Sequence, residues 1–471
     1  MGDVGRHNLF QLWGEQGMRT TRWLTLLTLS TALFLQACGG GGGAGGGGGS
    51  AGGGDGNGGA SGGGGNGATE EKVKITWSTW GNPGELGRFQ EFTAEFNKRH
   101  PNIEAELIPI PNDGYDDKIL TQLSGGTAPD VFYSGDALIS QLVSSGSVEL
   151  LTPYMEDPES ALGPDDLVEG LYGAAKRGDD VWGLTVDCNP MVLWFNKKLL
   201  QEAGIAELPT ELYEKGEWNW DAFQAMTEKL KAAGKYGFVL DSSSTRYYGW
   251  VTGNGGSVYD DAGNFILHED EKGKEAMKFL YDNIQSGNFT FAGSLPKGQG
   301  ADAMFLSNQL GFMGAGRWVL PIFKQADTLE YDIVPYPTNT GNKIEPAPIP
   351  TAYMVMNKST KHKEAAWTFM SEFVNQEGQT FRLAGGGNAV PSVRGIDDLV
   401  LEGNDPEHAQ YFLDAREVGY ALWVHETGVP GLSKDLRTKY EELWLTDIGF
   451  EAGLQSVADT AKAKIEEFRA K

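Results

Sequence analysis

The chain has 471 residues, of which 40% are apolar and 11% aromatic, and its 64 Asp and Glu against 38 Lys and Arg give a formal net charge of −26. This balance supports large hydrophobic cores and argues against a basic surface for nucleic acid, so no nucleic-acid partner is expected. Glycine is concentrated in residues 39–67, which hold 21 of the 67 glycines. From residue 68 onward the composition is that of an ordinary globular protein, and the length predicts two or three packed units.

The N-terminal segment has the pattern of an export signal. Two arginines within residues 18–22 precede a mostly apolar stretch, residues 23–35, which is too short to span a bilayer. The sequence Leu35-Gln-Ala-Cys38 that follows resembles a bacterial lipobox, in which Cys38 would be lipidated and become the mature N-terminus. We therefore expect a lipoprotein signal over residues 18–38, with Met18 rather than Met1 as a possible start. A plain export signal or a buried apolar segment is the alternative.

Residues 39–68 predict a flexible linker, because a tract with almost no side chains cannot pack. It would hold the folded part away from a membrane surface. Beyond Cys38 the chain has a single cysteine, Cys188, so the exported part cannot contain an internal disulfide. A nucleophilic role for Cys188 is conceivable, but a lone thiol beside Pro190 favours an inert, partly buried group.

Strands and helices alternate in the first part of the folded region. Period-two and helical patterns, with breaks at glycine and proline, predict strands over residues 72–77, 103–107 and 130–133, and helices over residues 86–100, 115–124 and 137–145. This alternation is typical of βαβ units in a largely parallel sheet. Ligands of such sheets lie at the carboxyl ends of the strands, here the loops after Trp77 and Tyr133.

A second unit follows. The patterns predict a helix from the Trp218-Asn-Trp-Asp221 segment to residue 230, a strand over residues 236–240, and amphipathic helices over residues 361–375 and 454–468. Residues 259–265 are rich in Asp, Asn and Gly. They predict a hairpin turn rather than a calcium loop, because the glutamate that closes such a loop is missing.

Several spaced motifs resemble the family 1 extracellular solute-binding proteins of ABC importers, the maltose-binding-protein-like lipoproteins. The resemblance covers most of residues 73–468 and rests on the order and spacing of these blocks: Trp77-Ser-Thr-Trp80, Glu95-Phe-Asn-Lys-Arg-His-Pro101, Gly126-Thr-Ala-Pro-Asp-Val-Phe132, Val181-Trp-Gly-Leu184, Met191-Val-Leu-Trp-Phe-Asn-Lys197, Met304-Phe-Leu-Ser307, Gly314-Ala-Gly-Arg-Trp318, Lys361-His-Lys-Glu-Ala-Ala-Trp367 and Ala389-Val-Pro-Ser392.

The resemblance implies a periplasmic-binding-protein-like α/β fold, with two α/β lobes joined by a multi-strand hinge and the ligand cleft between them. It places the N-lobe at residues 69–184 and 351–394 and the C-lobe at residues 187–348 and 395–471. It further implies a monomer that delivers its ligand to ABC permease subunits, and the lipobox-like segment independently predicts that lipidated Cys38 anchors the protein outside the cytoplasm. No catalytic activity, cofactor or metal is expected.

Tryptophans are the first candidates for a sugar site, because sugars present apolar C–H faces to aromatic platforms. Trp318 matches the family's stacking position, and Trp80 and Trp423 lie beside predicted loops or helix starts. Each of the three is alternatively a core residue. Trp367, on a helix with Phe369 and Phe373, is expected to be core.

Polar side chains would bind the hydroxyl rim of a sugar. Asp136 follows the third strand, Asp187 and Asn189 lie at the first expected hinge crossing, and Arg317 precedes the stacking Trp318. Solvated loop residues are the alternative reading of the first three. Asp130 is expected to brace its loop.

These residues together favour an uncharged mono- or oligosaccharide as ligand. A sugar phosphate or phosphodiester is the first alternative, because the helix start at Gly81-Asn-Pro-Gly84 is of a kind that binds anions. A cationic polyamine is another. A secreted glycosidase is the enzymatic rival, but no pair of carboxylates stands out as acid and base, and the six histidines form no His-x-x-x-His zinc motif.

Overall fold

A computed structural model describes residues 72–296 and 299–470 of the chain. The predicted signal over residues 18–38, Cys38 and the linker over residues 39–68 lie outside the described residues. Residues 68–471 form one compact unit. None of the described helices has the length and hydropathy of a membrane span.

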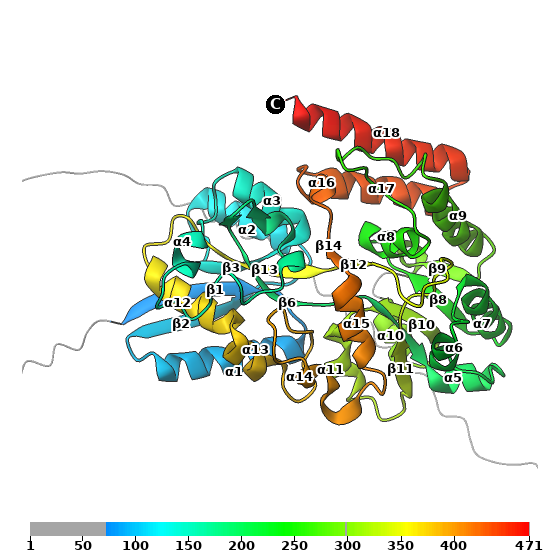
Figure 1. The fold of residues 1–471 in the computed structure, drawn as a ribbon, viewed down its shortest axis with the longest axis horizontal. Coiled ribbons are helices and arrows are strands. Elements are labelled where there is room, and N and C mark those ends of the chain that lie inside the picture. Colours follow the sequence, from blue (N-terminus) through cyan, green and yellow to red (C-terminus); the bar gives the residue numbers. More distant parts are fainter. Residues whose placement is uncertain (1–71, 297–298, 471) are drawn as a thin grey trace, which may run out of the picture. The chain divides into compact units, whose positions relative to one another are not determined.

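Two five-stranded sheets organise this unit (Figure 1). The first sheet has the strand order β2 (Ile103–Pro109), β1 (Val73–Thr79), β3 (Val131–Gly135), β13 (Thr351–Met356), β6 (Leu184–Cys188). The second has the order β11 (Tyr331–Val334), β7 (Val192–Asn196), β10 (Leu310–Ala315), β8 (Tyr236–Leu240), β9 (Phe289–Phe291). Two short pairs complete the strands: β12 (Pro348–Ile349) with β14 (Tyr420–Ala421), and β4 (Lys176–Arg177) with β5 (Asp180–Val181).

Helices pack on both sheets. Those of the first sheet are α1 (Pro83–Arg99), α2 (Tyr115–Gly125), α3 (Asp136–Ser144), α4 (Thr152–Met155), α12 (Lys363–Val374) and α13 (Gln376–Leu383). The remaining α-helices are α5 (Lys197–Glu202), α6 (Pro209–Lys215), α7 (Trp220–Ala232), α8 (Ser244–Gly253), α9 (Glu271–Gln285), α10 (Ala301–Leu306), α11 (Leu320–Phe323), α14 (Asp398–Leu401), α15 (Gln410–Val418), α16 (Val424–Thr427), α17 (Leu432–Leu445) and α18 (Phe450–Arg469). Short 3₁₀ turns are η1 (Glu169–Leu171), η2 (Gly173–Ala175), η3 (Ala292–Ser294), η4 (Arg317–Val319) and η5 (Glu402–Asn404).

The predicted elements are confirmed to within a few residues, including the Tyr259 to Phe265 hairpin. The expectation of a largely parallel sheet needs a correction. β1, β2 and β3 are parallel, but β13 runs antiparallel to both β3 and β6. In the second sheet β8 is parallel to β9 and β10, whereas β7 is antiparallel to β10 and β11. Both sheets are therefore mixed, because each contains a strand that pairs antiparallel with strands far from it in the sequence.

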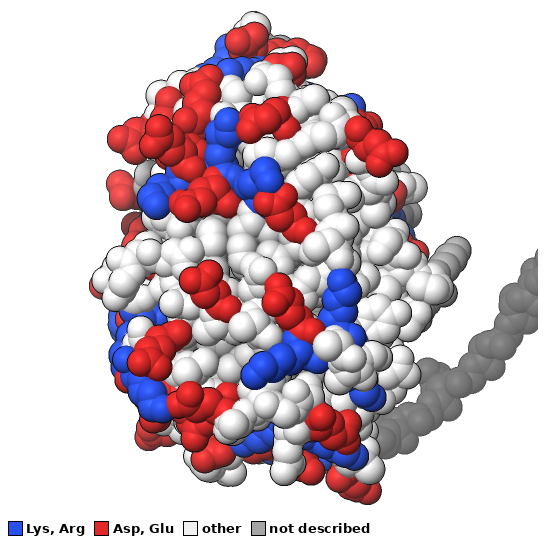
Figure 2. All heavy atoms as spheres, turned by 90° about the vertical axis from the view of Figure 1, so that its right-hand side faces the viewer, with Lys and Arg blue, Asp and Glu red and all other residues white. Residues whose placement is uncertain are grey.

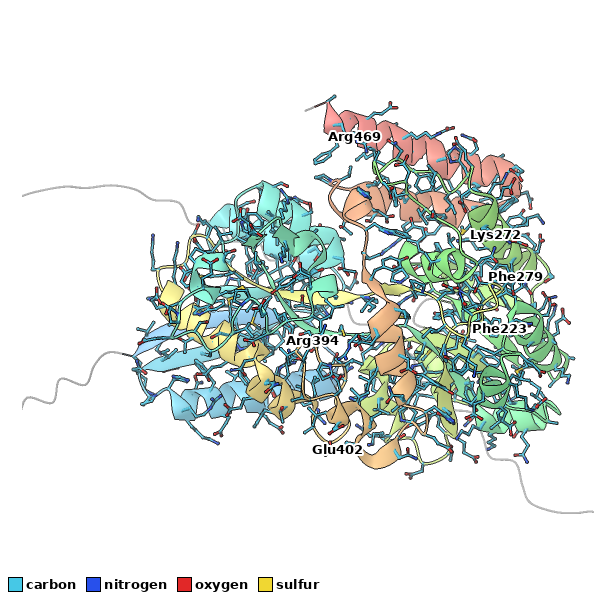
Figure 3. The ribbon with its side chains drawn as sticks, in the orientation of Figure 1. Phe223, Lys272, Phe279, Arg394, Glu402 and Arg469 are labelled. Atoms are coloured by element: carbon cyan, nitrogen blue, oxygen red, sulfur yellow. The ribbon has the colours of Figure 1, made fainter. Side chains whose placement is uncertain are left out.

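Each sheet has its own hydrophobic core. Trp77 and Phe369 meet in the first, with ring centroids 5.2 Å apart, and Trp367 is only 7% exposed, which confirms it as a core residue. Phe223 of α7 lies in the second core and the partly buried Phe279 of α9 packs against it; both are labelled in Figure 3. This separation of cores gives the fold two α/β lobes.

The chain passes from one core to the other at several points in the described residues. Val186 packs in the first core and Cys188 in the second, Tyr353 in the first and Ile349 in the second, and Val390 in the second just before the first-core residue Val393. Cys188 and Val390 also pair through two backbone hydrogen bonds of 2.9 and 2.8 Å. These crossings form a multi-strand hinge between the two lobes.

Local sequence determines where α1 begins. Asn82 caps the helix, since its Oδ1 accepts hydrogen bonds from the backbone N–H groups of Gly84 and Glu85 at 2.9 and 3.1 Å. The Glu85 carboxylate in return accepts the backbone N–H of Asn82 at 2.7 Å. With Pro83 in the first turn, this capping box fixes α1 directly after β1.

Candidate functional site

The seven predicted ligand residues lie at strand ends and hinge crossings. Trp80 follows β1, Asp136 begins α3 directly after β3, and Trp318 lies in η4 just after β10. Because the carboxyl ends of parallel strands are where α/β sheets bind ligands, this is the expected location of a site. In the structure, however, the three tryptophans keep partly exposed rings, whereas the polar side chains form hydrogen bonds within the protein.

Trp80 is half-buried and packs edge-on against two tyrosines. Its ring centroid lies 4.8 Å from that of Tyr115 and 5.5 Å from that of Tyr133. The hydroxyl of Tyr133 is buried without a hydrogen-bond partner among the described residues, and burial raises its pKa well above the usual value. Trp80 therefore keeps a partly exposed ring that rests on rigid aromatic neighbours.

Asp136 joins α3 to β13. Its Oδ1 accepts the hydroxyls of Thr351 at 2.6 Å and Tyr353 at 3.2 Å, and its Oδ2 accepts the Thr351 backbone N–H at 3.2 Å. Burial raises its pKa to about 6, against the opposing effect of these hydrogen bonds. The carboxylate is occupied by the protein itself, so its observed role is to brace the fold rather than to present a free acceptor.

Asp187 is paired inside the protein. The Nη1 of Arg382, from α13, lies 3.1 Å from its Oδ2, and the two residues are only 8% and 1% exposed. Burial raises the pKa of Asp187, although the charge of Arg382 opposes that rise. Asp187 thus ties β6 to α13.

Arg317 differs from its expected role. Its side chain is fully buried, and its guanidinium donates hydrogen bonds to the backbone carbonyls of Ala389 at 3.1 Å and Val400 at 3.3 Å. Burial, assisted by the nearby charge of Arg88, lowers its pKa to about 10. Arg317 is therefore a crosslink beside the hinge, because its charged group points to the chain's own backbone.

Asn189 and Gly316 shape the turn that carries Trp318. Oδ1 of Asn189 accepts the backbone N–H of Arg317 at 2.9 Å. A Cβ atom at Gly316 would lie 2.3 Å from the Trp318 ring and 2.7 Å from Cβ of Asn189, so only glycine fits there. Asn189 positions the turn, and the glycine lets the ring fold back over it.

Trp318 itself is half-buried and combines with Arg246, a residue that the sequence analysis missed. The Cζ of Arg246, from α8, lies 5.2 Å from the centroid of the Trp318 ring, within cation–π distance. Across the lobes, Asn82 Nδ2 is 3.5 Å from the Trp318 carbonyl oxygen. Arg246 follows the strand predicted over residues 236–240, but the sequence does not show that this strand pairs with β10, which Trp318 follows.

Trp423 lies in a second aromatic group, just before α16. Its ring stacks on Tyr420 with centroids 4.9 Å apart and an interplanar angle of 30°. Tyr248 and Tyr259 pack against the same ring, and their hydroxyls donate to the buried carboxylate of Glu426 at 2.7 and 2.9 Å. The sequence indicated Trp423 but not the tyrosines that hold it.

Other cavities and clusters lie away from these residues. Two cavities of about 450 Å³ have none of the seven in their lining. Asp332, Glu407 and His408 have metal-ligand spacing. However, the ammonium of Lys197 lies 3.3 Å from Asp332 and 3.0 Å from Glu407 and already compensates their charge. The expectation of no metal rests on sequence alone.

Asp130 and Cys188 follow their expected roles. Asp130 accepts hydrogen bonds from Thr76 and Thr360 and so braces its loop. Cys188 is fully buried, and burial raises the pKa of its thiol.

The chain is similar to known bacterial solute-binding proteins. The sequence profile of the family described as bacterial extracellular solute-binding protein matches residues 80–380. A Brucella abortus protein named as a binding protein is 24% identical over 287 residues, 59% of this chain and 66% of its own length. The arabinooligosaccharide-binding protein of Halalkalibacterium halodurans is 26% identical over 226 residues, 46% of each chain. A Streptomyces antibioticus lipoprotein is 27% identical over 158 residues, 33% of each.

Solved structures share the fold. An ABC substrate-binding protein of Listeria monocytogenes, solved with cycloalternan, has a TM-score of 0.74 at 21% identity and covers 84% of this chain and 100% of its own. The acarbose-binding GacH receptor of Streptomyces glaucescens has a TM-score of 0.70 at 17% identity, with the same coverage. UgpB of Mycobacterium tuberculosis, solved with glycerophosphocholine, has a TM-score of 0.71 at 16% identity and covers 84% and 99%.

Proposed function

Since the chain belongs to the bacterial extracellular solute-binding protein family, we propose that it captures an uncharged mono- or oligosaccharide outside the cytoplasm and delivers it to an ABC permease. The observation that carries this proposal is the half-buried Trp318 just after β10: its ring centroid lies 5.2 Å from the Cζ of Arg246, and its backbone carbonyl oxygen lies 3.5 Å from Nδ2 of Asn82 in the other lobe. Trp80 and Trp423 supply further partly exposed rings, which pack against Tyr115 and Tyr420 respectively. Such rings are platforms for the C–H faces of sugars.

The start of α1 favours a neutral ligand over an anion. Its first free N–H groups are already capped by Asn82, and Glu85 adds a negative charge to the first turn. A phosphate would have to displace the cap and face the Glu85 carboxylate. The sugar phosphate or phosphodiester alternative is supported by the fold shared with UgpB, whose structure holds glycerophosphocholine. A polyamine is the cationic alternative.

Ligand binding should close the two lobes. A ligand that contacts both lobes favours the closed state by its difference in affinity for the two states. We expect titration calorimetry to give binding by maltose or an arabino-oligosaccharide, and solution scattering of the same protein to give a smaller radius of gyration at saturation. Binding by glycerophosphocholine or spermidine alone would contradict the sugar assignment, and release of reducing ends from an oligosaccharide would favour the glycosidase rival.

We propose further that Cys38 anchors the protein to the membrane as a lipoprotein monomer. The lipobox-like Leu35-Gln-Ala-Cys38 and the following glycine tract support this placement. Cys38→Ser should move the protein from the detergent phase to the aqueous phase in a detergent-partitioning assay of cells, because the acyl chains have no other attachment residue there. The matched variant Cys188→Ser should stay with the membrane fraction. Detergent partitioning of Cys38→Ser at the wild-type level would contradict the anchor.

A further inference from the structure

The segment that carries Trp423 contacts both lobes. β14, which precedes Trp423, pairs in parallel with β12, so Ala421 lies opposite Ile349. α16, which follows Trp423, contacts α3 and η2 of the other lobe (Figure 1). A Cβ atom at Gly173 of η2 would lie 3.2 Å from that of Ala421, so the two backbones approach closely there. Trp423 therefore lies between two elements that meet the opposite lobe.

A buried carboxylate holds this segment on its own lobe. Glu426 of α16 is only 3% exposed, and its Oε2 accepts the hydroxyls of Tyr248 at 2.7 Å and Tyr259 at 2.9 Å. Tyr248 belongs to α8 and Tyr259 to the hairpin before α9, so one oxygen ties α16 to two separate elements. The hydroxyl of Tyr440, from α17, lies 3.5 Å from that of Tyr248 and extends the network.

Both tyrosines act as hydrogen-bond donors to this carboxylate at neutral pH. Burial raises the pKa of Tyr248 and of Tyr259 well above the usual value, and the negative charge of Glu426 acts in the same direction. Their hydroxyls therefore stay protonated. Hydrogen-bonded networks in a buried, low-dielectric setting hold their side chains in one arrangement.

The two tyrosine rings also pack against Trp423. Their centroids lie 5.4 Å (Tyr248) and 5.8 Å (Tyr259) from that of the indole, with interplanar angles of 50° and 66°. The backbone N–H of Glu426 donates to the Trp423 carbonyl at 3.0 Å. The bonds that orient the two tyrosines consequently set the position of the indole as well.

We infer that Glu426 is a positioning residue for sugar binding, which fixes the Trp423 ring at the lobe boundary through Tyr248 and Tyr259. This inference rests on the proposed function, in which Trp423 contacts the ligand, and deepens it by naming what orients that ring. A ring that is held in place before binding loses little freedom when the ligand arrives. Loss of the carboxylate should therefore weaken binding although no ligand contact is removed.

Titration calorimetry on the full chain, with maltose, maltotriose and arabinotriose, tests this role. Glu426→Met accepts neither hydroxyl and should weaken binding of the sugar that the wild type binds by about fivefold or more. Glu426→Gln keeps an oxygen acceptor and should retain the affinity to within about twofold. Trp423→Ala should lose about tenfold. Trp423→Ala/Glu426→Met should lose no more than Trp423→Ala alone, because Glu426 acts through the ring.

A milder variant decides the question if Glu426→Met does not fold. Tyr259→Phe removes one donor but keeps the ring, and it should weaken binding by about threefold. The matched control is Tyr213→Phe, at a tyrosine of α6 that is also 8% exposed and lies outside the network. This control should bind as the wild type does.

The outcomes separate the inference from the proposed function. Wild-type affinity in folded Glu426→Met, or in Tyr259→Phe, would overturn the inference while the proposed function stands. Equal losses in Glu426→Gln and Glu426→Met, or losses of Trp423→Ala and Glu426→Met that add in the double variant, would overturn it as well. Failure of the wild type to bind any of the three sugars would overturn the proposed function, and the inference with it.

Discussion

Replacing Arg382 by Met is expected to lower the free energy of unfolding by about 3 to 5 kcal/mol, because it leaves Asp187 as a buried charge without its partner. Arg382 is 1% exposed and also donates to the carbonyls of Val186 at 3.1 Å and Phe373 at 3.2 Å. Its guanidinium lies 4.1 Å from the centroid of the Phe373 ring. Met keeps most of the volume but supplies none of these hydrogen bonds. Urea unfolding followed by circular dichroism measures the loss.

The loss should depend on pH. Burial already raises the pKa of Asp187, and removal of the opposing Arg382 charge raises it further. A carboxyl group whose folded-state pKa exceeds its unfolded value contributes stability below the unfolded pKa of about 3.9, and that contribution is lost as the pH rises through the folded value. The deficit of Arg382→Met should therefore grow from pH 4 to pH 7.

Two controls test the cause of this loss. Arg382→Met/Asp187→Asn should recover part of the stability, since the unpaired charge is gone. Arg437→Met, at an exposed arginine of α17, should change stability by less than about 0.5 kcal/mol. A deficit of Arg382→Met no larger than that of Arg437→Met would show that the Asp187 pair contributes nothing.

The βα pattern of the first lobe was predictable because each element there is local. Ile119 of α2 and the apolar residues of β1 to β3 carry their periodicity within a few residues, and turns follow at Gly126 and Gly146. The antiparallel strands were not predictable. β13 joins β3 after more than 200 intervening residues, and its fully buried Tyr353 to Met356 run has no alternating pattern to distinguish it from a helix segment.

The positions of the candidate residues at strand ends were predictable from the sequence, but their contacts were only partly predictable. A strand end can be inferred from sequence, and Trp80 and Trp318 do lie at strand ends with half-buried rings. Whether a polar side chain faces a ligand or the protein depends on partners that are distant in sequence. The carboxylate of Asp136 accepts a hydrogen bond from the Thr351 hydroxyl, and the guanidinium of Arg317 donates one to the Ala389 carbonyl. Neither partner is near in the chain. The same long-range pairing hides Arg246.

Truncating Trp318 to Ala should weaken sugar binding by roughly tenfold to 150-fold, or about 1.4 to 3 kcal/mol, because it removes the proposed stacking platform. The fold should tolerate this change, since the ring is half-buried, and the backbone turn is held by Asn189 rather than by the indole. Arg246 would lose its cation–π neighbour, so the polar contacts to the sugar should weaken together with the stacking. Titration calorimetry with the best-binding neutral sugar measures the change.

The chain offers a matched pair as control for this prediction. Trp182 is also half-buried and also carries an arginine, Arg177, whose Cζ lies 6.0 Å from the ring centroid, but it lies between β5 and β6 and packs on the first core. Trp182→Ala removes the same surface from the same kind of pair, so it should leave sugar affinity within about twofold of the wild type. Equal affinity losses in Trp318→Ala and Trp182→Ala would mean that the effect is general destabilisation, and wild-type affinity in Trp318→Ala would remove Trp318 from the site.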